Sequence, residues 1–281
     1  MPRFVIEKSS TVGEAAQAGP STPALGLGAG AVIAVIGAKG GCGATTLATH
    51  MAAARARKGK VLLMDFDFHR GGVGGALDLW VDRSMQQVLE LGPKLDPLAL
   101  SASLIEHRSG MFVLPQPFDL ANLVEPSAQE ARHILNVASQ SFDRVFVDGG
   151  SRVDESLLGL VLRADLVVLV CDPHVGALRD ALRLVRLLRS LDLPEGRIRM
   201  VLNRLDEDLA FSLPETAQTH LEIPFCATVS RDDATFRQAE FAGRLVWEVN
   251  KRSPTSKALE KLWDIVGGEG EDVLGRMRRA P

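Results

Sequence analysis

The stretch that decides the fold is Gly37-Ala38-Lys39-Gly40-Gly41-Cys42-Gly43-Ala44-Thr45-Thr46. It follows the apolar run at 31–36 and precedes an alanine-rich segment, 47–54, whose residues favour a helix. A strand, a glycine-rich loop and a helix in this order are typical of a phosphate-binding loop. Glycines let backbone N–H groups turn toward phosphate oxygens, and the helix N-terminus adds partial positive charge. We therefore expect these residues to line a nucleotide site.

The lysine of this loop stands in an unusual place. The common pattern G-x-x-x-x-G-K-[ST] has a lysine directly before the hydroxyl residue, whereas this chain has Ala44 there and Lys39 early in the loop. Thr45, the hydroxyl residue, is placed to ligate Mg²⁺. Because a lysine at position 44 would neutralise phosphate charge during hydrolysis, we expect the nucleotide to bind firmly and to be hydrolysed slowly.

Further apolar runs predict strands at 60–64, 110–114, 144–147, 166–170 and 197–202. These runs are almost continuously apolar, which is typical of strands buried on both faces. Helical patterns lie between them, and strands that alternate with helices form parallel sheets with right-handed crossovers. The sequence therefore predicts an α/β fold of the P-loop NTPase kind, with a mostly parallel sheet and helices on both faces.

Polar residues follow the ends of the predicted strands. They are Asp65, Asp67, Asp148, Asp172 and Asn203. Ligands of parallel α/β sheets bind beyond the carboxyl ends of the strands, where these side chains would meet. Each residue also has an ordinary explanation, because Asp and Asn often end strands and cap turns. Their clustering is a second, independent indication of a site at this edge of the sheet.

The motif K-G-G-x-G-x-T-T at 39–46 resembles the deviant Walker A motif of the MinD/ParA group of P-loop ATPases. The resemblance covers residues 31–265 and is closest to the CpaE/TadZ branch, which works in the assembly of Flp-type (Tad) pili and related secretion. The segments at 229–233 (VSRDD) and 250–254 (NKRSP) are similar to the C-terminal pattern of that branch. Longer relatives carry an N-terminal receiver-like domain, and we expect none in this chain.

The resemblance implies roles for the charged residues of the site. Lys39 looks like the signature lysine, which reaches the partner's nucleotide across a dimer interface. Asp65 and Asp67 look like the D-x-D switch, in which the first carboxylate bonds Mg²⁺-bound water and the second holds the attacking water. Asp148, followed by two glycines, resembles a Walker B aspartate that reaches Mg²⁺ through water. The expected catalytic residues are therefore Lys39 and Asp67, and the expected metal ligands are Thr45, Asp65 and Asp148.

The pair Asn203-Arg204 resembles the adenine-reading pair of the group. The Asn203 amide offers both a donor and an acceptor to the edge of the base. The alternative is that Asn203 is only a turn residue at a strand end. The expected cofactors are ATP and Mg²⁺, and the expected assembly is an ATP-dependent homodimer.

Length and composition fit one globular domain. Of the 281 residues, 46% are apolar and 24% are charged, which is ordinary globular usage. We expect an ATPase domain at 31–266, preceded at 1–30 by a disordered tail rich in Ala, Gly, Ser and Pro, and followed at 267–281 by a flexible basic tail. The three cysteines form no CxxC pair and the six histidines are scattered, so the sequence indicates neither a disulfide framework nor a metal-ligand cluster.

The charge of the chain limits its partners. Lys and Arg number 32 against 35 Asp and Glu, so DNA is not expected as a partner and membrane association is at most peripheral. The helix predicted at 174–190 carries Arg179, Arg183 and Arg186 on one face, which we interpret as a solvated surface. No secretory signal or spanning segment is evident. The expected location is the bacterial cytoplasm, with the pole or the inner face of the membrane as places of action.

Three functions remain open from the sequence. The first is an ATP-binding switch that localises or assembles a Flp/Tad-type pilus or secretion system, dimerises with ATP, and hydrolyses it slowly or only as a dimer. The second is a ParA-like chromosome or plasmid partition ATPase that binds DNA nonspecifically. The third is a degenerate structural homologue that binds no nucleotide. ATP-dependent DNA binding that falls with salt would favour the second, and failure to bind ATP–Mg²⁺ would favour the third.

Overall fold

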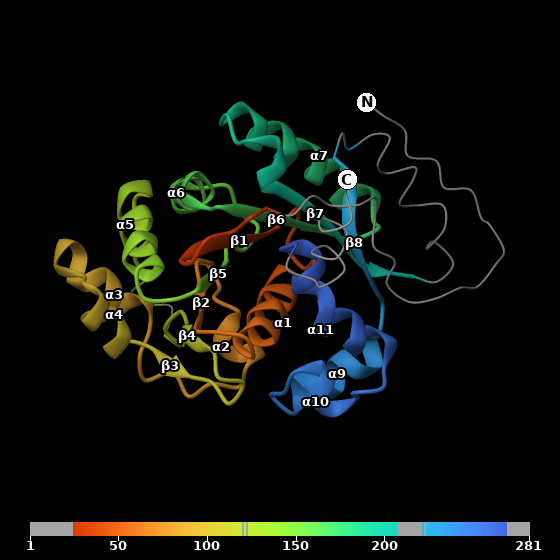
Figure 1. Cartoon of the computed structure of the whole chain (residues 1–281), viewed down its shortest axis with the longest axis horizontal. Helices are drawn as coiled ribbons and strands as arrows, with labels where there is room; N and C mark the ends of the chain where they lie inside the picture. Colours follow the sequence, from red (N-terminus) through yellow and green to blue (C-terminus); the bar gives the residue numbers. More distant parts are fainter. Residues whose placement is uncertain (1–24, 120, 122, 207–220, 222, 269–281) are drawn as a thin grey trace, which may run out of the picture.

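The structure is a computed structural model that describes residues 25–119, 121, 123–206, 221 and 223–268. Its centre is a sheet of eight strands in the order β3-β4-β2-β5-β1-β6-β7-β8 (Figure 1). The strands are β1 (Ala31–Gly37), β2 (Val61–Asp65), β3 (Ile105–Glu106), β4 (Phe112–Leu114), β5 (Arg144–Asp148), β6 (Leu166–Cys171), β7 (Ile198–Leu205) and β8 (Phe225–Ser230). Neighbouring strands run parallel except β3 and β4, which pair antiparallel at one edge.

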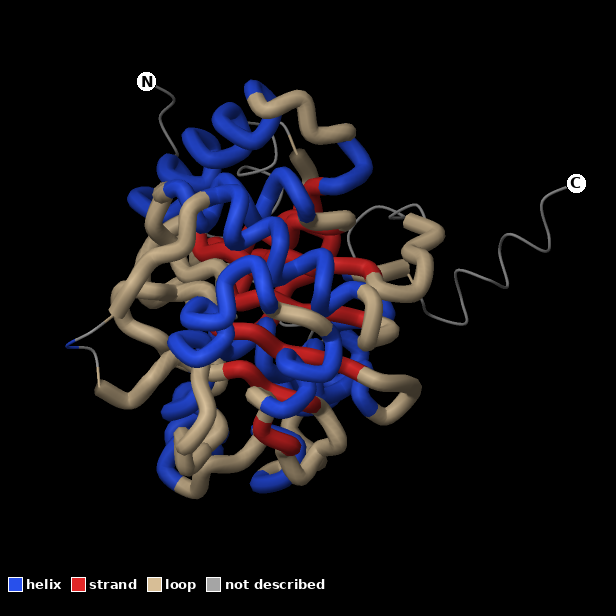
Figure 2. The backbone as a smooth tube through the Cα atoms, turned by 90° about the vertical axis from the view of Figure 1, so that its left-hand side faces the viewer, coloured by secondary structure: helices blue, strands red, loops and turns tan. Residues whose placement is uncertain are grey.

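Helices cover both faces of this sheet, as Figure 1 and Figure 2 show from two directions. The helices are α1 (Ala44–Ala56), α2 (Val73–Ala76), α3 (Met85–Leu91), α4 (Pro97–Ala102), α5 (Ala128–Ser139), α6 (Glu155–Arg163), α7 (Val175–Ser190), α9 (Asp233–Phe241), α10 (Val246–Val249) and α11 (Pro254–Val266). Short 3-10 turns occur at η1 (Gly92–Lys94) and η3 (Glu195–Arg197). The expected α/β fold, a mostly parallel sheet between helices, is confirmed.

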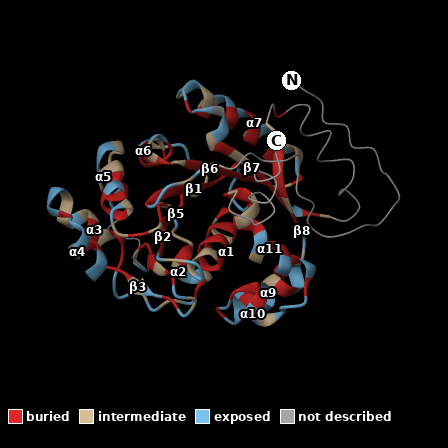
Figure 3. Ribbon diagram, viewed as in Figure 1, coloured by how far each residue is buried: buried red, intermediate tan, exposed pale blue. Residues whose placement is uncertain are grey.

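The side chains of β1 explain why helices are needed on both faces. Val32 and Ile36 belong to an apolar layer shared with α5, α6 and α7, whereas Ile33 and Val35 belong to a second layer shared with α1 and α11. Successive side chains of a strand point to opposite faces, so a strand that is apolar at every position must be covered twice. Figure 3 shows the result, with the central strands β1, β2, β5 and β6 buried along their length and exposed positions on the outer sides of the helices.

The helices that border the carboxyl edge of the sheet begin at defined caps. Ser127 precedes α5 in a capping box, in which its Oγ accepts from Glu130 N (3.3 Å) and Glu130 Oε2 accepts from Ser127 N (2.8 Å). Asp154 precedes α6, and its Oδ1 accepts from Leu157 N at 2.9 Å. Such caps satisfy N–H groups that have no partner inside the helix. They therefore determine where the two preceding loops end.

The end of β7 differs from the sequence prediction. The predicted strand stopped at residue 202, so that Asn203 would follow it, but β7 continues to Leu205. Its register with β8 shifts between Leu202 and Leu205, and Arg204 has a φ of 56°. The added pairing with β8, a strand that the sequence analysis did not predict, extends β7. Asn203 and Arg204 therefore lie inside the irregular end of a strand and not in the turn after it.

The predicted tails lie almost wholly outside the described residues. Residues 1–24 of the N-terminal tail and residues 269–281 of the C-terminal tail are not described. Leu27 and Gly28, near the end of the predicted N-terminal tail, accept hydrogen bonds from Arg144 through their carbonyl oxygens at 3.1 and 2.9 Å. The described helices and strands run from β1 to the end of α11, and the limits of the ATPase domain remain a prediction.

The predicted amphipathic helix at 174–190 is present as α7. Ala181 and Leu188 are buried on its inner face, whereas Arg179, Arg183 and Arg186 are exposed on its outer face. None of the helices within the described ranges has both the length and the apolar content that a bilayer crossing requires.

Candidate nucleotide site

The glycine-rich loop connects the end of β1 to the start of α1 at the carboxyl edge of the sheet. Gly41 and Gly43 have φ angles of 87° and 92°, in the left-handed region. Gly43 directly precedes α1, and no side chain caps the helix there. The first N–H groups of α1 therefore lack the side-chain acceptor that commonly satisfies one of them. N–H groups arranged in this way, at the positive end of a helix, suit a phosphate ligand.

The first two residues of the loop anchor it to the sheet. Gly37 N donates to Gly150 O and Ala38 N donates to Val170 O, both at 2.8 Å. These N–H groups are used within the protein and connect the loop to β6 and to the segment after β5. Gly37 and Ala38 therefore help to fix the shape of the loop. Direct contact between these two residues and a nucleotide remains a prediction.

Asn203 and Arg204 hold the loop from the side of β7. Asn203 Nδ2 donates to Cys42 O at 2.8 Å, and Arg204 Nη1 donates to Gly41 O at 2.7 Å. A Cβ atom at Gly43 would lie 2.3 Å from Asn203 Nδ2, so only glycine permits both this approach and the positive φ. Asn203 Oδ1 is buried and has no hydrogen-bond partner among the described residues. Asn203 Oδ1 is therefore available as a hydrogen-bond acceptor at the edge of the glycine-rich loop.

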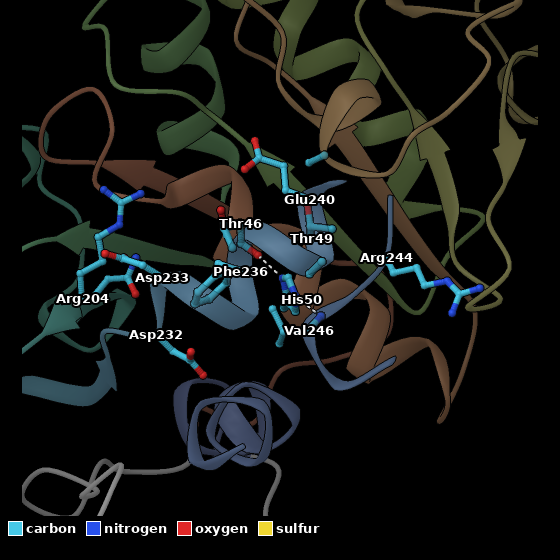
Figure 4. Close-up of a pocket in the computed structure, with 13 residues that line it drawn as sticks. Thr46, Thr49, His50, Arg204, Asp232, Asp233, Phe236, Glu240, Arg244 and Val246 are labelled. Carbon is cyan, nitrogen blue, oxygen red and sulfur yellow. Dashed lines mark hydrogen bonds between the residues drawn. The ribbon is translucent and has the colours of Figure 1, made fainter. Parts of the chain in front are cut away.

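A pocket opens beside this pair, between α1, β7 and α9 (Figure 4). Its lining includes Thr46, His50, Asn203, Arg204, Asp232 and Phe236. An aromatic face and an unpaired amide oxygen suit a planar base that carries a hydrogen-bond donor. Asn203 and Arg204 thus border both this pocket and the glycine-rich loop. Base recognition itself stays a prediction, because here both side chains donate to the loop.

The two segments of the C-terminal pattern, 229–233 and 250–254, meet beside this pocket. Ser253 Oγ donates to Asp232 Oδ2 at 2.8 Å, and Ser253 also caps α11. Asp232 in turn caps α9, where its side chain accepts from Thr235 N. The two segments therefore form one wall that positions α9 and α11 next to the pocket.

Two carboxylates end adjacent strands of the sheet. Asp65 is the last residue of β2, Asp148 is the last residue of β5, and the parallel register pairs them directly. Neighbouring strands lie about 4.8 Å apart, so the two side chains are close. Both residues are 0% exposed. Two buried carboxylates at this distance repel each other when both are ionised, and a divalent cation would offset that repulsion.

Burial raises the pKa of both carboxylates above the usual range. For Asp65, the charge of Asp148 adds to the effect of burial, while hydrogen bonds from Gly72 N (2.8 Å) and Val73 N (3.0 Å) to Oδ2 oppose it. For Asp148, burial is again the main cause of the raised pKa, and the Thr45 hydroxyl opposes it. Asp148 Oδ2 is buried without a hydrogen-bond partner among the described residues. This oxygen is therefore an acceptor that a cation or its bound water could use.

Asp67 lies on the loop after β2 and packs against the loop after β5. Its Oδ1 accepts from His69 N and Arg70 N, both at 3.2 Å. A Cβ atom at Gly150, which has a φ of 61°, would lie 2.9 Å from Asp67 Cγ. Any side chain at position 150 would therefore displace Asp67. The two loops touch at this point, next to the ends of β2 and β5.

Thr45 lies against the loop after β2. A Cβ atom at Gly72 would meet Thr45 Oγ1 at 3.2 Å, and the Thr45 hydroxyl also acts on the pKa of Asp148. The structure thus brings together the three predicted metal ligands, Thr45, Asp65 and Asp148, with Asp67 beside them. Hydroxyl and carboxylate oxygens are ligand types that Mg²⁺ accepts, directly or through water.

The two positions at which a lysine could serve the phosphates have different surroundings. Ala44 is buried at the start of α1, with its Cβ directed toward Gly37, and it brings no charge to the loop. Lys39 is exposed, and its Nζ lies 4.0 Å from where a Cβ atom of Gly176 would be, in the first turn of α7. The ammonium group is therefore at the surface beside α7.

Two buried residues of this region are not among those that the sequence pattern indicates. Gln116 Nε2 donates to Asp65 O at 2.7 Å. His50 Nδ1 bonds Thr46 O at 2.7 Å, and His50 Nε2 accepts from Val246 N at 3.2 Å. Gln116 comes shortly after a predicted strand, so the strand-end reasoning used for the aspartates could have found it. Only tertiary contacts identify His50.

The chain matches a family model described as the CobQ/CobB/MinD/ParA nucleotide binding domain over residues 33–245. It is 26% identical over 242 residues to an uncharacterised ATP-binding protein of Methanocaldococcus jannaschii, covering 84% of this chain and 88% of that protein. A ParA family ATPase from Chlorobium tepidum TLS has a similar structure, with a TM-score of 0.78, 20% identity, and coverage of 84% of this chain and 99% of that one. The septum site-determining protein MinD of Pyrococcus horikoshii OT3, complexed with Mg-ADP, gives a TM-score of 0.72 at 20% identity, covering 89% and 99% of the two chains.

At 20% identity the two structural likenesses concern the fold alone. The family model, by contrast, spans most of the chain and includes the glycine-rich loop, the three carboxylates near it, and the Asn203-Arg204 pair. The chain therefore belongs to the CobQ/CobB/MinD/ParA nucleotide-binding family.

Proposed function

We propose that this protein is a MinD/ParA-type switch that binds ATP–Mg²⁺, dimerises in the ATP-bound state and hydrolyses ATP slowly. The observation that carries the proposal is the pairing of a glycine-rich loop at an uncapped helix with two buried carboxylates, Asp65 and Asp148, at adjacent strand ends. Membership of a nucleotide-binding family supports it. So does the fold it shares with a MinD solved with Mg-ADP.

The residues present fit both ATP and Mg²⁺. The loop amides and the first turn of α1 would hold the phosphates, while Thr45, Asp65 and Asp148 would hold Mg²⁺ directly or through water. The unpaired buried oxygen of Asp148 is the observation that favours a cation at this point. Bound Mg²⁺ would neutralise phosphate charge. Asp67, held on its loop by two backbone N–H groups, would orient the attacking water.

We propose slow hydrolysis because neither position of the glycine-rich loop that could supply a lysine holds an ammonium group at the start of α1. Ala44 occupies the position of the usual lysine, and the Lys39 ammonium group lies beside α7. Loss of one preorganised charge contact in such a site lowers the rate by a factor on the order of 10²–10³. A second copy that contributed its Lys39 would restore the charge, so turnover would then depend on dimerisation.

ATP hydrolysis measured over a range of protein concentrations tests this proposal. The specific activity of the wild type is expected to rise with concentration, because the dimer is the active form. In Lys39→Ala, the specific activity is expected not to rise with protein concentration. In Lys94→Ala, which replaces an exposed lysine away from the loop, the rise is expected to persist. Ala44→Lys is expected to hydrolyse ATP faster at all concentrations. Fast, concentration-independent turnover by the wild type would contradict the proposal.

Sedimentation with and without ATP–Mg²⁺ tests the proposed homodimer. The wild type is expected to sediment as a dimer only with the nucleotide. Asp67→Asn, which removes the charge that would orient water, is expected to accumulate the ATP-bound dimer. A wild type that stays a monomer at saturating ATP would refute dimerisation. Failure to bind ATP–Mg²⁺ at millimolar concentration would instead support the degenerate, nucleotide-free homologue.

We further propose that the ATP-bound dimer acts in the bacterial cytoplasm as a localisation or assembly factor of a Flp/Tad-type pilus or secretion system, at the pole or the inner face of the membrane. The support is the resemblance of the glycine-rich loop and of the segments 229–233 and 250–254 to the CpaE/TadZ branch. Tagged protein captured from cells in the ATP-bound state is expected to retain pilus or secretion ATPases. Recovery of DNA that is lost at high salt would point to a partition ATPase instead.

A further inference from the structure

A second group of metal-ligand side chains lies next to the loop that carries Asp67. His69 Nε2 is 3.2 Å from Glu125 Oε1 and 3.2 Å from Asp154 Oδ2. The three ligand atoms all lie within 4.8 Å of one another. The residues come from the loop after β2, from the segment before α5, and from the cap of α6. We refer to His69, Glu125 and Asp154 as the His69 cluster.

Hydrogen bonding does not fully satisfy the His69 cluster. One ring nitrogen carries at most one hydrogen, so His69 Nε2 cannot make a well-aligned hydrogen bond to both carboxylate oxygens at once. Both separations are at the long end of the range for N–H···O bonds. The two acidic groups also face the same small volume, where their charges repel unless a cation lies between them.

The spacing of the ligand atoms suits a metal ion. Ligands at about 2.0–2.2 Å from a tetrahedral Zn²⁺ lie about 3.3–3.6 Å from one another. The observed 3.2 Å separations from His69 Nε2 to the two carboxylate oxygens differ from this by a few tenths of an ångström. The oxygens of Glu125 and Asp154 lie within 4.8 Å of each other, so side-chain adjustments of up to about 1 Å bring all three atoms to tetrahedral spacing.

Asp154 is oriented toward His69 by its other oxygen. Its Oδ1 accepts from Ser156 Oγ at 2.7 Å and from Leu157 N at 2.9 Å, which leaves Oδ2 directed at the ring. Partial burial raises the pKa of Asp154, but these hydrogen bonds and the contact with His69 lower it below the usual range overall. The group is therefore an ionised carboxylate at neutral pH with one oxygen held and one available, as is typical of metal ligands with outer hydrogen bonds.

We propose that the His69 cluster binds a divalent first-row transition metal ion, with Zn²⁺ as the reference ion and water in the remaining positions. An imidazole nitrogen favours Zn²⁺ and its neighbours in the series over Mg²⁺, which prefers an all-oxygen shell. The cluster thus takes a different ion from the Mg²⁺ expected at Asp65 and Asp148. The side chains of His69, Glu125 and Asp154 are 22%, 45% and 19% exposed, which leaves a route for the ion and its water ligands.

A bound ion would connect the loop of Asp67 to the start of α6. His69 N donates to Asp67 Oδ1 at 3.2 Å, so a metal held by the His69 ring restrains the backbone next to the residue proposed to orient water. The site itself does not depend on ATP binding. The test of the metal site therefore uses no nucleotide, and its outcome is independent of whether the proposed ATP-dependent function is correct.

Zn²⁺ titration of the full chain, stripped with a chelator and kept in excess Mg²⁺, tests the proposal. One Zn²⁺ ion is expected per chain. Loss of an outer hydrogen-bond partner of a metal ligand weakens binding by a factor of about 10–100, so His69→Ala and Asp154→Asn, which remove proposed ligands, are each expected to weaken binding at least that much. Asn is itself a good helix cap, so Asp154→Asn keeps α6 capped and folded. His174→Ala is the matched control, because exposed His174 contacts one carboxylate, that of Asp172 at 2.9 Å, within the part of the chain that the structure describes. Wild-type affinity is expected for this variant.

X-ray absorption of the Zn²⁺-loaded protein supplies a second readout. It is expected to show one imidazole and oxygen ligands at about 2.0–2.2 Å, without sulfur. The absence of saturable binding below millimolar Zn²⁺ would overturn the proposal, as would binding that His69→Ala leaves unchanged. A sulfur ligand would overturn it too, because the three cysteines of the chain are buried and lie outside the cluster. Circular dichroism establishes that each variant is folded before titration.

Discussion

Replacement of His50 by glutamine is expected to remove part of the pH dependence of stability in the nucleotide-free protein. His50 lies in α1, one turn after Thr46, and is 5% exposed. Its Nδ1 bonds Thr46 O, and its Nε2 accepts from Val246 N. These partners assign the neutral ring with its hydrogen on Nδ1. Protonation of Nε2 would place a hydrogen against the Val246 N–H donor.

The size of the effect follows from the pKa of His50. Burial lowers this pKa from 6.5 to about 4, against smaller opposing contributions from Thr46 and Glu248. Between these values the unfolded chain binds the proton and the folded chain does not, so stability is full above pH 6.5 and falls as the pH drops toward 4. At about 1.4 kcal/mol per pKa unit, the full loss is about 3 kcal/mol, of which about 2 kcal/mol occurs between pH 7.5 and pH 5.

Urea unfolding at pH 7.5 and pH 5, followed by circular dichroism, measures this contribution. The quantity compared is the difference between the two free energies of unfolding for each protein. The wild type is expected to lose about 2 kcal/mol more than His50→Gln on going to pH 5. The buried carboxylates Asp65 and Asp148 are present in both proteins, so their contributions cancel. His174→Gln removes a histidine whose side chain is 76% exposed and is expected to behave like the wild type.

Equal pH differences for the wild type and His50→Gln would refute the reasoning. That result would mean that the imidazole is not held neutral by burial between α1 and α10. A larger loss for His50→Gln than for the wild type would refute it as well, because the sign of the linkage would be reversed.

The remaining predictions concern the loop, the metal ligands and the core. Asp148→Asn removes a buried charge and is expected to stabilise the nucleotide-free protein by about 1–3 kcal/mol in calorimetry, while weakening Mg²⁺-dependent ATP binding. Stability and ATP affinity equal to those of the wild type would contradict the proposed role of Asp148 as a buried Mg²⁺ ligand. Gly43→Ala places a methyl group 2.3 Å from Asn203 Nδ2 at a φ of 92°, so a loss of about 1–3 kcal/mol in urea unfolding and weaker ATP binding are expected. Wild-type values for both would show that the loop adapts. Trp263→Ala removes a buried ring packed edge-on against Phe146, with centroids 4.9 Å apart. This substitution is expected to lower the free energy of unfolding in urea by about 3–5 kcal/mol and to leave ATP affinity unchanged at low temperature. A smaller loss of stability would mean that neighbouring side chains fill the cavity left by the ring.

The central part of the fold could be predicted because local sequence specifies it. The run at 31–36 is apolar at every position, which requires cover on both faces and hence helices on both sides of a parallel sheet. The carboxyl ends of parallel strands share one edge, so the positions of Asp65 and Asp148 after two apolar runs predict that both lie at that edge. The strand order, in which β2 and β5 are neighbours, decides that they lie side by side. The register that pairs them and the burial of both carboxylates agree with that expectation.

The end of β7 and the strand β8 could not be predicted in the same way. β8 (Phe225–Ser230) mixes apolar and polar residues over a short length, and its place in the sheet depends on pairing with β7. That pairing extends β7 and puts Asn203 and Arg204 against the carbonyl oxygens of the glycine-rich loop. The sequence suggested the residues, but not the contacts that they make.

The sequence alone determined the strand-loop-helix unit, the sheet behind it and the identity of the groups at its edge, because each depends on periodicity and spacing within short segments. Only the tertiary structure decided that Lys39 lies beside α7, that His50 connects α1 to α10, and that His69 meets Glu125 and Asp154. These contacts join residues far apart in the chain, and side chains meet over such separations only where the packing of the sheet and the caps of the helices bring their loops together.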